Sequence, residues 1–476
     1  MGTARISPDI FKAYDIRGIV GDTLTPDTVQ DIGRAVGSLA RERGNRRIVI
    51  GRDGRLSGPE MIQALATGLM EMGLEVIDVG MVPSPVVYFA AEHLSTGAAV
   101  AVTGSHNPPQ YNGFKIIAGG ETLSGEAIQE LRRRIEQQDF VNDEADTDSG
   151  SRHSEDVTSA YLDRITSDIK LKRPFKICVD CGNGVAGELA PELYRRLGCE
   201  VIELFTTIDG TFPNHHPDPI DEKNLVDIKA AVFKHNADFG LAFDGDGDRL
   251  GVVSPDGTTI WPDRQMILFA RDILKRQPGA EIIYDVKCTR LLARAIEAAG
   301  GHAHMYKTGH SLIKAKLKNS DAALAGEMSG HIFFKERWYG FDDGLYAGAR
   351  LCELLSTFDQ SPQAVFDELP TSLITPEIRL ELKEGEQHRL VAELVAAAIP
   401  DSSVSANHNA FADATIHTID GLRVDFEDGF ALARASNTTP TVIIRFEADN
   451  DTAMRRIMTT FRTLFDHVRP GLDLPF

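Results

Sequence analysis

Three aspartates alternate with glycines in the segment DGDGDR: Asp244, Asp246 and Asp248. Carboxylates at alternate positions can converge on one hard cation, and glycine permits the backbone bends that turn them inward. An EF-hand is excluded, because Arg249 stands at the position of its invariant glycine and Pro255 at that of its bidentate glutamate. Three carboxylates leave the octahedron of Mg²⁺ incomplete. Water or a phosphate oxygen must supply the remaining ligands, which suits phosphoryl transfer.

Ser105 lies in a second polar loop, TGSHNPPQYNGFK, after a run of small apolar residues at 97–102. A serine delivered onto a turn by a buried strand can act as a nucleophile or carry a phosphate. The esterase elbow G-x-S-x-G does not fit, because Thr103 and Asn107 occupy its glycine positions. Read alone, the loop is equally consistent with a structural turn in which the serine is a cap.

Two further loops carry groups that suit a sugar phosphate. In GEMSGH, Glu327, Ser329 and His331 alternate, and in an extended segment they would share one face toward sugar hydroxyls. In RASNTTP, a guanidinium, hydroxyls and an amide can surround a phosphate: Arg434, Ser436, Asn437 and Thr438. Each loop alone is also consistent with a polar turn beside a strand.

A G-x-G-x-x-G pattern at 182–187 favours a different function. It follows a strand, and Glu203 lies about 20 residues further on, as in dinucleotide-binding oxidoreductases. The pattern arises readily by chance in a chain with 42 glycines. An oxidoreductase would also leave the serine loop, the acidic loop and GEMSGH without a role.

Strand-like and helix-like segments alternate along most of the chain, which predicts α/β layers with mixed sheets. We expect four domains, with a polar linker at 142–155 and a strand–loop–helix rhythm that hints at an internal repeat. The first three would be α/β domains, and the last would be smaller and α+β. The predicted limits are 1–150 for the serine loop, 151–255 for the metal loop, 256–370 for sugar recognition and 371–476 for phosphate binding.

The composition limits the kinds of molecule that the protein can bind. The 476 residues carry a formal net charge of −20, so the surface repels nucleic acid and anionic membrane. No apolar stretch approaches the roughly 20 residues that span a bilayer. The N-terminal residues lack the apolar core of a secretory signal, so we expect a cytoplasmic protein. Five cysteines imply no disulfide framework.

Together these loops resemble the α-D-phosphohexomutase superfamily, in particular the bacterial phosphomannomutase/phosphoglucomutase group. The resemblance runs from FKAYDIRG at 11–18 to RASNTTP and covers nearly the whole chain. Phosphoglucosamine mutases, the alternative, typically have glutamine before the serine of the third loop and R-A-S-G-T in the fourth. The resemblance implies three related α/β domains and a smaller α+β domain in a heart shape around a central cleft, with one loop from each domain.

The resemblance also implies a mechanism. Ser105 would carry a phosphate, and Mg²⁺ would be held by a phosphoryl oxygen and the three aspartates of DGDGDR. A hexose 1-phosphate, clamped by the fourth loop, would become a 6-phosphate through a hexose 1,6-bisphosphate. Glu327 and Ser329 would bind the 3- and 4-hydroxyls. Because mannose and glucose differ at the 2-hydroxyl, we expect both to be substrates.

Several supporting roles follow from the same resemblance. Lys115, Arg17 and His331 are candidates for the general acid/base, and arginine is a poor base because it stays protonated. Arg249 and Lys115 would neutralise charge on the transferred group. Tyr14 would support the serine loop, and two residues would touch the sugar or its phosphate: Lys287 and His310. We expect a monomer acting on small phosphosugars. A sugar phosphatase or a non-catalytic sugar-phosphate binder remains an alternative.

Overall fold

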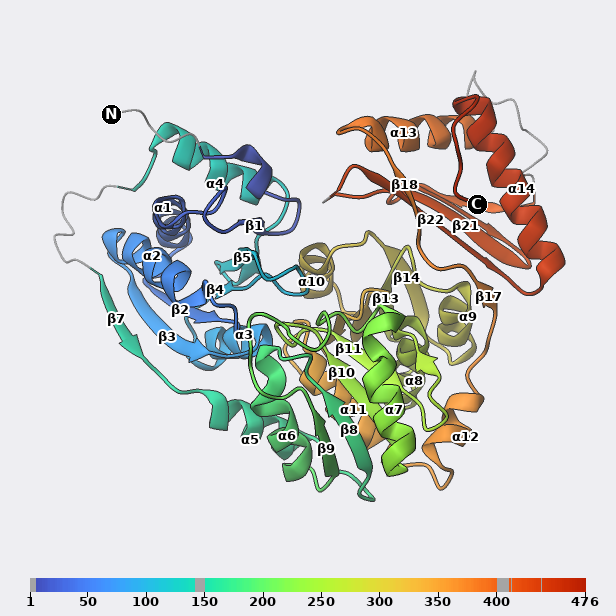
Figure 1. Cartoon of the computed structure of the whole chain (residues 1–476), viewed down its shortest axis with the longest axis horizontal. Helices are drawn as coiled ribbons and strands as arrows, with labels where there is room; N and C mark the ends of the chain where they lie inside the picture. Colours follow the sequence, from blue (N-terminus) through green and yellow to red (C-terminus); the bar gives the residue numbers. More distant parts are fainter. Residues whose placement is uncertain (1–5, 142–149, 400–410, 412, 438) are drawn as a thin grey trace.

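The computed structural model describes residues 6–141, 150–399, 411, 413–437 and 439–476. The chain forms four groups of strands and helices, each around its own sheet (Figure 1). The first and last groups lie on opposite sides of the molecule, and the second and third lie between them. This arrangement confirms the predicted fold class. None of the helices described here combines the length and apolar character that a membrane crossing requires.

The first sheet has the order β1-β5-β4-β2-β3-β7, with β6 paired to β5. Its strands are β1 (Ile16–Ile19), β2 (Arg47–Arg52), β3 (Glu75–Met81), β4 (Ala99–Val102), β5 (Tyr111–Ala118), β6 (Glu121–Thr122) and β7 (Ser151–Ser154). Its helices are α1 (Pro26–Glu42), α2 (Gly58–Glu71), α3 (Ser84–His93) and α4 (Glu126–Gln137). Thr25 caps α1 by accepting the N–H of Thr28, and Pro26 occupies the first turn, where no N–H is needed.

The second sheet has the order β12-β11-β10-β8-β9. Its strands are β8 (Lys176–Asp180), β9 (Glu200–Leu204), β10 (Phe239–Phe243), β11 (Leu250–Val253) and β12 (Thr259–Ile260), and its helices are α5 (Thr158–Asp168), α6 (Leu189–Arg196) and α7 (Val226–His235). Every residue of β10 is buried, as expected for a central strand covered on both faces. The acidic segment DGDGDR begins immediately after this strand.

The third sheet has the order β14-β13-β15-β16. Its strands are β13 (Glu281–Asp285), β14 (His302–Tyr306), β15 (Leu324–Gly326) and β16 (Ile332–Phe334). The helices of this part are α8 (Pro262–Arg276), α9 (Arg290–Ala298), α10 (His310–Lys318), α11 (Gly344–Ser356) and α12 (Pro362–Asp367). The GEMSGH segment connects β15 to β16.

The fourth sheet has the order β17-β22-β21-β20-β19, with β18 paired to β22, and all its pairings are antiparallel. Its strands are β17 (Leu373–Ile374), β18 (Ile378–Glu381), β19 (Thr415–His417), β20 (Leu422–Phe426), β21 (Gly429–Ala435) and β22 (Thr441–Ala448). The helices α13 (Glu386–Ala398) and α14 (Asp451–Val468) pack on it. This is the α+β unit that the sequence predicts.

The first three sheets contain the same four-stranded unit. The orders β3-β2-β4-β5, β9-β8-β10-β11 and β14-β13-β15-β16 match strand for strand. In each unit three parallel strands are followed by an antiparallel fourth. The serine loop, the acidic loop and the GEMSGH loop all connect the third strand of a unit to its fourth. The repeat therefore places three chemically different loops at equivalent positions.

The predicted linker at 142–155 is partly wrong. Residues 142–149 lie outside the described residues, but Ser151–Ser154 forms β7 and pairs in parallel with β3. The strand is polar because most of it is exposed at a sheet edge, so composition alone did not reveal it. Likewise β12 pairs with β11 and extends the second sheet past the predicted limit at 255.

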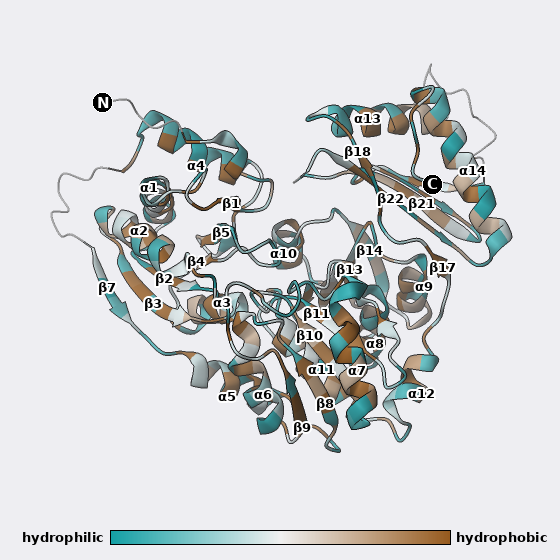
Figure 2. Cartoon of the chain, viewed as in Figure 1, coloured by the Kyte–Doolittle hydropathy of each residue, from teal (hydrophilic) through white to brown (hydrophobic). Residues whose placement is uncertain are grey.

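Buried apolar residues form one large core and several smaller ones. The largest runs from Val49 to Leu369 and combines residues of the first three sheets and their helices. The fourth sheet and its two helices have a separate core, from Leu380 to Leu474. Figure 2 shows the hydrophobic colouring concentrated on strands and on one side of many helices. The first three units are thus joined through a shared interior, although the first also has a separate core from Ile10 to Ile135. The fourth packs mainly around its own core, and Phe430 and Leu432 join it to Val286 of the third.

Candidate functional site

Ser105 lies at the start of the loop after β4 and is 1% exposed. Its backbone has a φ of +50°, a left-handed conformation that costs a non-glycine residue roughly 1–2 kcal/mol. Its amide N–H donates to the hydroxyl of Thr103 at 2.7 Å, and its own hydroxyl donates to Oδ2 of Asp244 at 2.9 Å. The serine that the sequence singled out therefore contacts the acidic loop of the next domain.

Arg55 holds this loop in place, although no sequence motif predicts its role. Its guanidinium donates to the main-chain carbonyls of Ser105 (2.7 Å), Asn107 (2.6 Å), Pro108 (2.7 Å) and Tyr111 (3.0 Å), and the residue is 1% exposed. A fork of fixed donors is suited to gathering several carbonyls at once. Arg55 lies about 50 residues before the loop, so no local pattern indicated the contact.

Asp53 completes this buried anchor. Its carboxylate accepts from the Thr103 hydroxyl at 2.7 Å, from the Gly104 amide at 3.2 Å and from the Arg55 side chain at 3.1 Å. A Cβ at Gly104 would approach Cζ of Arg55 to 2.4 Å, so only glycine fits there. The left-handed turn at Ser105 is therefore held by contacts on both sides of it.

The acidic loop brings its three carboxylates together, as predicted. One oxygen each from Asp244, Asp246 and Asp248 lies within 4.8 Å of the others, and all three residues are fully buried. Burial and repulsion from its two neighbours raise the pKa of Asp244 well above its ordinary value. Oδ1 of Asp246 is buried and accepts no hydrogen bond from any described residue. A hard divalent cation fits this oxygen-donor set and would relieve the repulsion.

Lys115, on β5, is the cation that the protein itself supplies to this loop. Its ammonium donates to Asp246 at 2.7 Å and also to Asp248. Burial opposes the charge, but the two carboxylates outweigh it and raise the pKa of Lys115 well above its ordinary value. Ser84, at the start of α3, donates to Asp246 at 2.6 Å, a contact that no sequence motif predicts.

Glu327, Ser329 and His331 do come together, although the local geometry differs from the prediction. The segment is a tight turn rather than an extended strand, because Gly330 has a φ of +96° and its N–H donates to the carbonyl of Glu327 at 3.1 Å. Nδ1 of His331 lies 2.9 Å from the Ser329 hydroxyl and 3.2 Å from Oε2 of Glu327. Oε1 of Glu327 accepts the Gly309 amide at 2.6 Å.

His331 also connects the third domain to the acidic loop. Its Nε2 lies 3.3 Å from Oδ1 of Asp248 and 3.4 Å from Nε of Arg249. Burial opposes the charge of the imidazolium, but the Asp248 carboxylate outweighs it and raises the pKa of His331 to about 9. Arg249 in turn lies 3.8 Å from Asp244 and 3.7 Å from Asp218. Arg249 and Ser105 therefore both lie next to Oδ2 of Asp244.

His310 and Tyr14 lie on the same side of the third domain. The ring of His310 stacks on that of His331, with centroids 5.4 Å apart. The hydroxyl of Tyr14 donates to the carbonyl of Thr308 at 2.8 Å, and Ser311 donates to the carbonyl of Tyr14 at 3.0 Å. Tyr14 thus ties the first domain to the third rather than contacting the serine loop directly.

The fourth loop, between β21 and β22, reaches this region through Asn437, whose amide donates to the hydroxyl of Tyr14 at 2.5 Å. Arg434 is buried and donates to Asp420 at 3.1 Å, and Asp420 also accepts the Thr308 amide at 3.0 Å. Ser436 accepts from the backbone and hydroxyl of Thr439 within its own loop. Thr438 lies outside the described residues.

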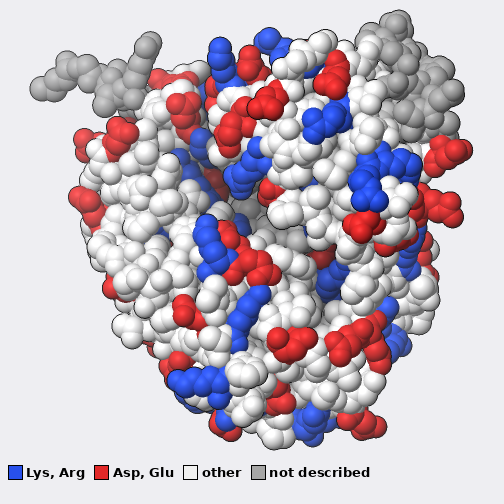
Figure 3. Space-filling model, turned by 45° about the vertical axis from the view of Figure 1, so that its right-hand side comes forward, with Lys and Arg blue, Asp and Glu red and all other residues white. Residues whose placement is uncertain are grey.

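The other two predicted residues are positioned by neighbouring carboxylates. Arg17 donates to Asp15 at 2.8 Å and to the side chain of Asn107, in the serine loop, at 2.5 Å. Lys287 donates to Glu377 at 3.0 Å, and this ammonium is the main reason that the pKa of Glu377 falls to about 2. Figure 3 shows a hollow in the surface bordered by both Lys or Arg and Asp or Glu side chains.

The G-x-G-x-x-G segment has a packing role. Val185 donates to the carbonyl of Gly245 at 3.1 Å, so the segment supports the acidic loop from behind. A Cβ at Gly187 would lie 1.9 Å from the carbonyl oxygen of Thr206. The helix that follows, α6, starts only at Leu189, after a short 3₁₀ turn. Glu203 pairs with Arg195 on the surface. These glycines are explained by close backbone approach.

Four family models match the chain in succession. They are described as phosphoglucomutase/phosphomannomutase, alpha/beta/alpha domains I, II and III and C-terminal domain, and they match residues 8–142, 159–257, 261–373 and 377–464. Together they cover most of the chain, and each of the four loops falls within one of them.

Similar proteins span the whole length of the chain. A phosphoglucomutase of Neisseria gonorrhoeae is 55% identical over 97% of this chain and 98% of that protein. A phosphomannomutase/phosphoglucomutase of Pseudomonas aeruginosa is 50% identical over the full length of both chains. The crystal structure of a phosphoglucomutase/phosphomannomutase family protein from Burkholderia thailandensis is 53% identical and superposes with a TM-score of 0.91 over 99% of this chain and 100% of that one. The chain therefore belongs to the phosphoglucomutase/phosphomannomutase family.

Proposed function

We propose that this protein interconverts hexose 1-phosphates and hexose 6-phosphates, for mannose and glucose, through a phosphate carried on Ser105. The observation that carries the proposal is the contact of the buried Ser105 with Asp244, one of three clustered carboxylates that could hold a cation. Relatives at 50% identity or more are named phosphoglucomutase or phosphomannomutase/phosphoglucomutase, so a phosphoglucosamine mutase is not favoured.

In the proposed cycle the resting enzyme carries phosphate on Oγ of Ser105. The free hydroxyl of a bound hexose monophosphate attacks this phosphorus, the P–Oγ bond breaks, and a hexose 1,6-bisphosphate results. The bisphosphate turns over, and Oγ attacks its other phosphate to regenerate phosphoserine and release the isomer. Such chemistry depends mainly on positioning and on neutralising charge.

The residues around Ser105 would have separate roles in metal binding, charge neutralisation and proton exchange. Asp244, Asp246 and Asp248 would hold Mg²⁺, which supplies charge neutralisation at the transferred phosphoryl group. Lys115, fixed as a cation between two of these aspartates, adds to it. We assign proton exchange to His331, because its pKa of about 9 is nearer neutrality than that of Lys115, which is raised well above its ordinary value, and Arg17 stays protonated.

The remaining loops would bind the sugar. Glu327 and Ser329 would hold the 3- and 4-hydroxyls, with His310 and Lys287 beside them. The nonreacting phosphate would be clamped by the fourth loop, through Arg434, Ser436, Asn437 and Thr438. The contact of Asn437 with Tyr14 supports closure of this loop over the first domain. We also propose a cytoplasmic monomer that acts on free phosphosugars.

Measuring the intact mass of the purified protein tests whether Ser105 carries a phosphate. We expect a species heavier by one phosphate, with the modification mapped to the peptide that contains Ser105. Treatment with excess hexose monophosphate should remove it, because the phosphate leaves with the sugar when bisphosphate dissociates. A stable phosphate on any other residue would contradict the proposal.

Substrate range tests the sugar-binding loop. Because Glu327 and Ser329 address hydroxyls that mannose and glucose share, we expect both 1-phosphates to be turned over with kcat/KM values within about a thousandfold. A larger ratio would require more than about 4 kcal/mol of discrimination at the 2-hydroxyl. Steady-state kinetics with the two sugars, each supplied with its own 1,6-bisphosphate, decides between these outcomes.

Metal removal tests the acidic loop. Chelation should abolish turnover and added Mg²⁺ should restore it. Replacing Asp246 by Asn should weaken Mg²⁺ binding at least about tenfold, since one of three anionic ligands is lost. Calorimetric titration of Mg²⁺ measures the affinity directly. Asp256→Asn, in the turn between β11 and β12 and outside the triad, is the control, and an equal loss there would argue against the assignment.

A further inference from the structure

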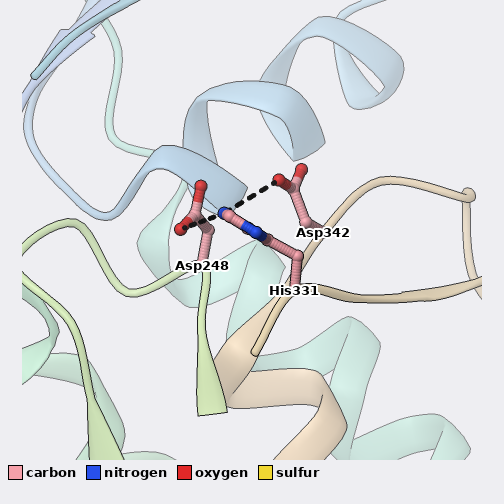
Figure 4. A group of neighbouring side chains, drawn as sticks. All are labelled: Asp248, His331 and Asp342. Carbon is pink, nitrogen blue, oxygen red and sulfur yellow. Dashed lines mark ion pairs between the residues drawn. The ribbon is translucent and has the colours of Figure 1, made fainter. Parts of the chain in front are cut away.

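His331 lies between two carboxylates that come from different domains. Figure 4 shows Asp248, from the acidic loop, and Asp342, from the segment after β16, on either side of its ring. Nε2 of His331 is 3.3 Å from Oδ1 of Asp248 and 3.9 Å from Oδ2 of Asp342. One nitrogen and two oxygens thus face one another across an interface between the second and third domains, within 4.8 Å.

Both of these oxygens lack a hydrogen bond. Asp248 and Asp342 are fully buried, and neither Oδ1 of the first nor Oδ2 of the second accepts a hydrogen bond in the part of the chain that the structure describes. The only charged partners of these two oxygens among the described residues are imidazole nitrogens at 3.3–3.9 Å, and a bound cation would satisfy the buried carboxylates more fully. The proposed Mg²⁺ loop does not account for Asp342, which is not one of its ligands.

Each of the three groups is held by a second contact at its other end. Asp342 accepts from Lys314 through Oδ1 at 2.8 Å, and Asp248 accepts from Lys115 through Oδ2. Nδ1 of His331 contacts Ser329 at 2.9 Å and Glu327 at 3.2 Å. Outer contacts of this kind fix the orientation of metal ligands, and here they leave Oδ1, Nε2 and Oδ2 directed at one another.

We propose that Asp248, His331 and Asp342 form a second cation site, which prefers a borderline divalent metal such as Zn²⁺ to Mg²⁺. Imidazole with two carboxylates is a donor set typical of zinc, whereas magnesium prefers oxygen alone. Tetrahedral Zn²⁺ with ligands at about 2.0–2.2 Å keeps its donors about 3.3–3.5 Å apart. The observed 3.3 Å already fits this spacing, and the 3.9 Å distance and the oxygen–oxygen distance, which is within 4.8 Å, have to shorten when the metal binds. Water would occupy the fourth position.

Several positively charged side chains surround the site. Only one of them, Arg249, has to move before a metal can bind. Lys115 and Lys314 bind the outer oxygens, and His310 lies 3.7 Å from Oδ2 of Asp342. Nε of Arg249 lies 3.4 Å from Nε2 of His331 and has to turn away, toward Asp218, when a metal binds. The metal replaces the proton on Nε2, which leaves to solvent.

If the proposed function is correct, a metal bound at this second site would affect catalysis. A metal on Nε2 removes the imidazole from proton exchange and takes a carboxylate from the Mg²⁺ loop. Zn²⁺ would therefore inhibit turnover even with Mg²⁺ present. Metal binding itself does not depend on that function, so it is tested separately.

Calorimetric titrations of Zn²⁺ and of Mg²⁺ into the chelator-treated, full-length protein test the site. Asp342→Asn should weaken Zn²⁺ binding at least tenfold and change Mg²⁺ affinity less than threefold. The matched control is Asp343→Asn, an adjacent buried aspartate that contacts Tyr161 and caps α11, and it should change neither. Equal effects on both metals, or no effect on Zn²⁺, would overturn the proposal.

X-ray absorption of the Zn²⁺-loaded wild-type protein gives a test that needs no variant to fold. With Mg²⁺ in excess, we expect the scattering signature of one imidazole ligand, which disappears in His331→Gln. A spectrum with oxygen ligands alone would place Zn²⁺ in the aspartate loop and refute the second site. Inhibition by Zn²⁺ without an imidazole signature would likewise assign the inhibition to that loop.

Discussion

Replacing Ser105 by Ala is expected to lower kcat for isomerisation by at least about 10⁴-fold, because the variant lacks the hydroxyl that accepts and returns the phosphoryl group in the proposed cycle. The variant should keep its affinity for hexose phosphate within a few fold, since the predicted sugar-binding residues lie on other loops. It should also show no phosphate by intact mass. Coupled assays in both directions measure the loss.

Ser95→Ala is the matched control for this experiment. Ser95 has a φ of +52°, almost the same as the +50° of Ser105, but it is exposed at the end of α3. Alanine is therefore subject to the same backbone strain at both positions. A large loss of activity in the Ser95 variant, or residual turnover of Ser105→Ala above about 1% of wild type, would contradict the assignment.

Replacing Arg55 by Lys is expected to lower kcat by about 10²-fold with little change in KM. A single ammonium cannot hold four carbonyls that a guanidinium fork reaches, so the serine shifts by a fraction of an ångström to an ångström. Misplacement on this scale costs about that factor in rate. KM should hold, because Arg55 contacts the serine loop and not the sugar-binding loops.

The matched control is Arg52→Lys, a half-buried arginine at the end of β2 that donates to the carbonyl of Asp53 at 3.1 Å. If Arg55 had only a structural role, Arg55→Lys would lower the midpoint of thermal unfolding but would not lower kcat selectively while leaving KM unchanged. The second measurement is the half-life of the phosphoserine in buffer, which should shorten in Arg55→Lys as the loop loosens. Wild-type kcat in a folded Arg55→Lys protein would show that the loop is positioned without it.

The sequence was most informative where chemistry is concentrated in short segments. The aspartates of DGDGDR and the polar residues around Ser105 are each encoded within a few residues, and apolar strands on either side mark their place. The sequence could only hint at the internal repeat. What repeats is the order of the strands, and the loops at equivalent positions have unrelated side chains. Pairing between strands showed it.

The residues that escaped prediction act over long sequence distances. Arg55 lies in a different segment from the carbonyls that it binds, and Ser84 reaches Asp246 across a domain boundary. Asp342 and Asp420 look like ordinary loop acids in the sequence. Their importance comes from burial and from what faces them. The strand β7 was missed for the opposite reason, since an edge strand needs little apolar surface.

The distribution of buried apolar residues also determines when each part of the chain can fold during synthesis. The largest core draws on residues from Val49 to Leu369, so it cannot close until most of the chain has left the ribosome. At typical rates of synthesis this interval is on the order of tens of seconds, during which apolar surface of the first unit waits for its partners. The last unit, with a core of its own from Leu380 to Leu474, can fold as soon as its final helix emerges. The first unit can form its own separate core, from Ile10 to Ile135, early in synthesis, whereas the core that it shares with the second and third units closes only later, shortly before the loop that carries Arg434 is made.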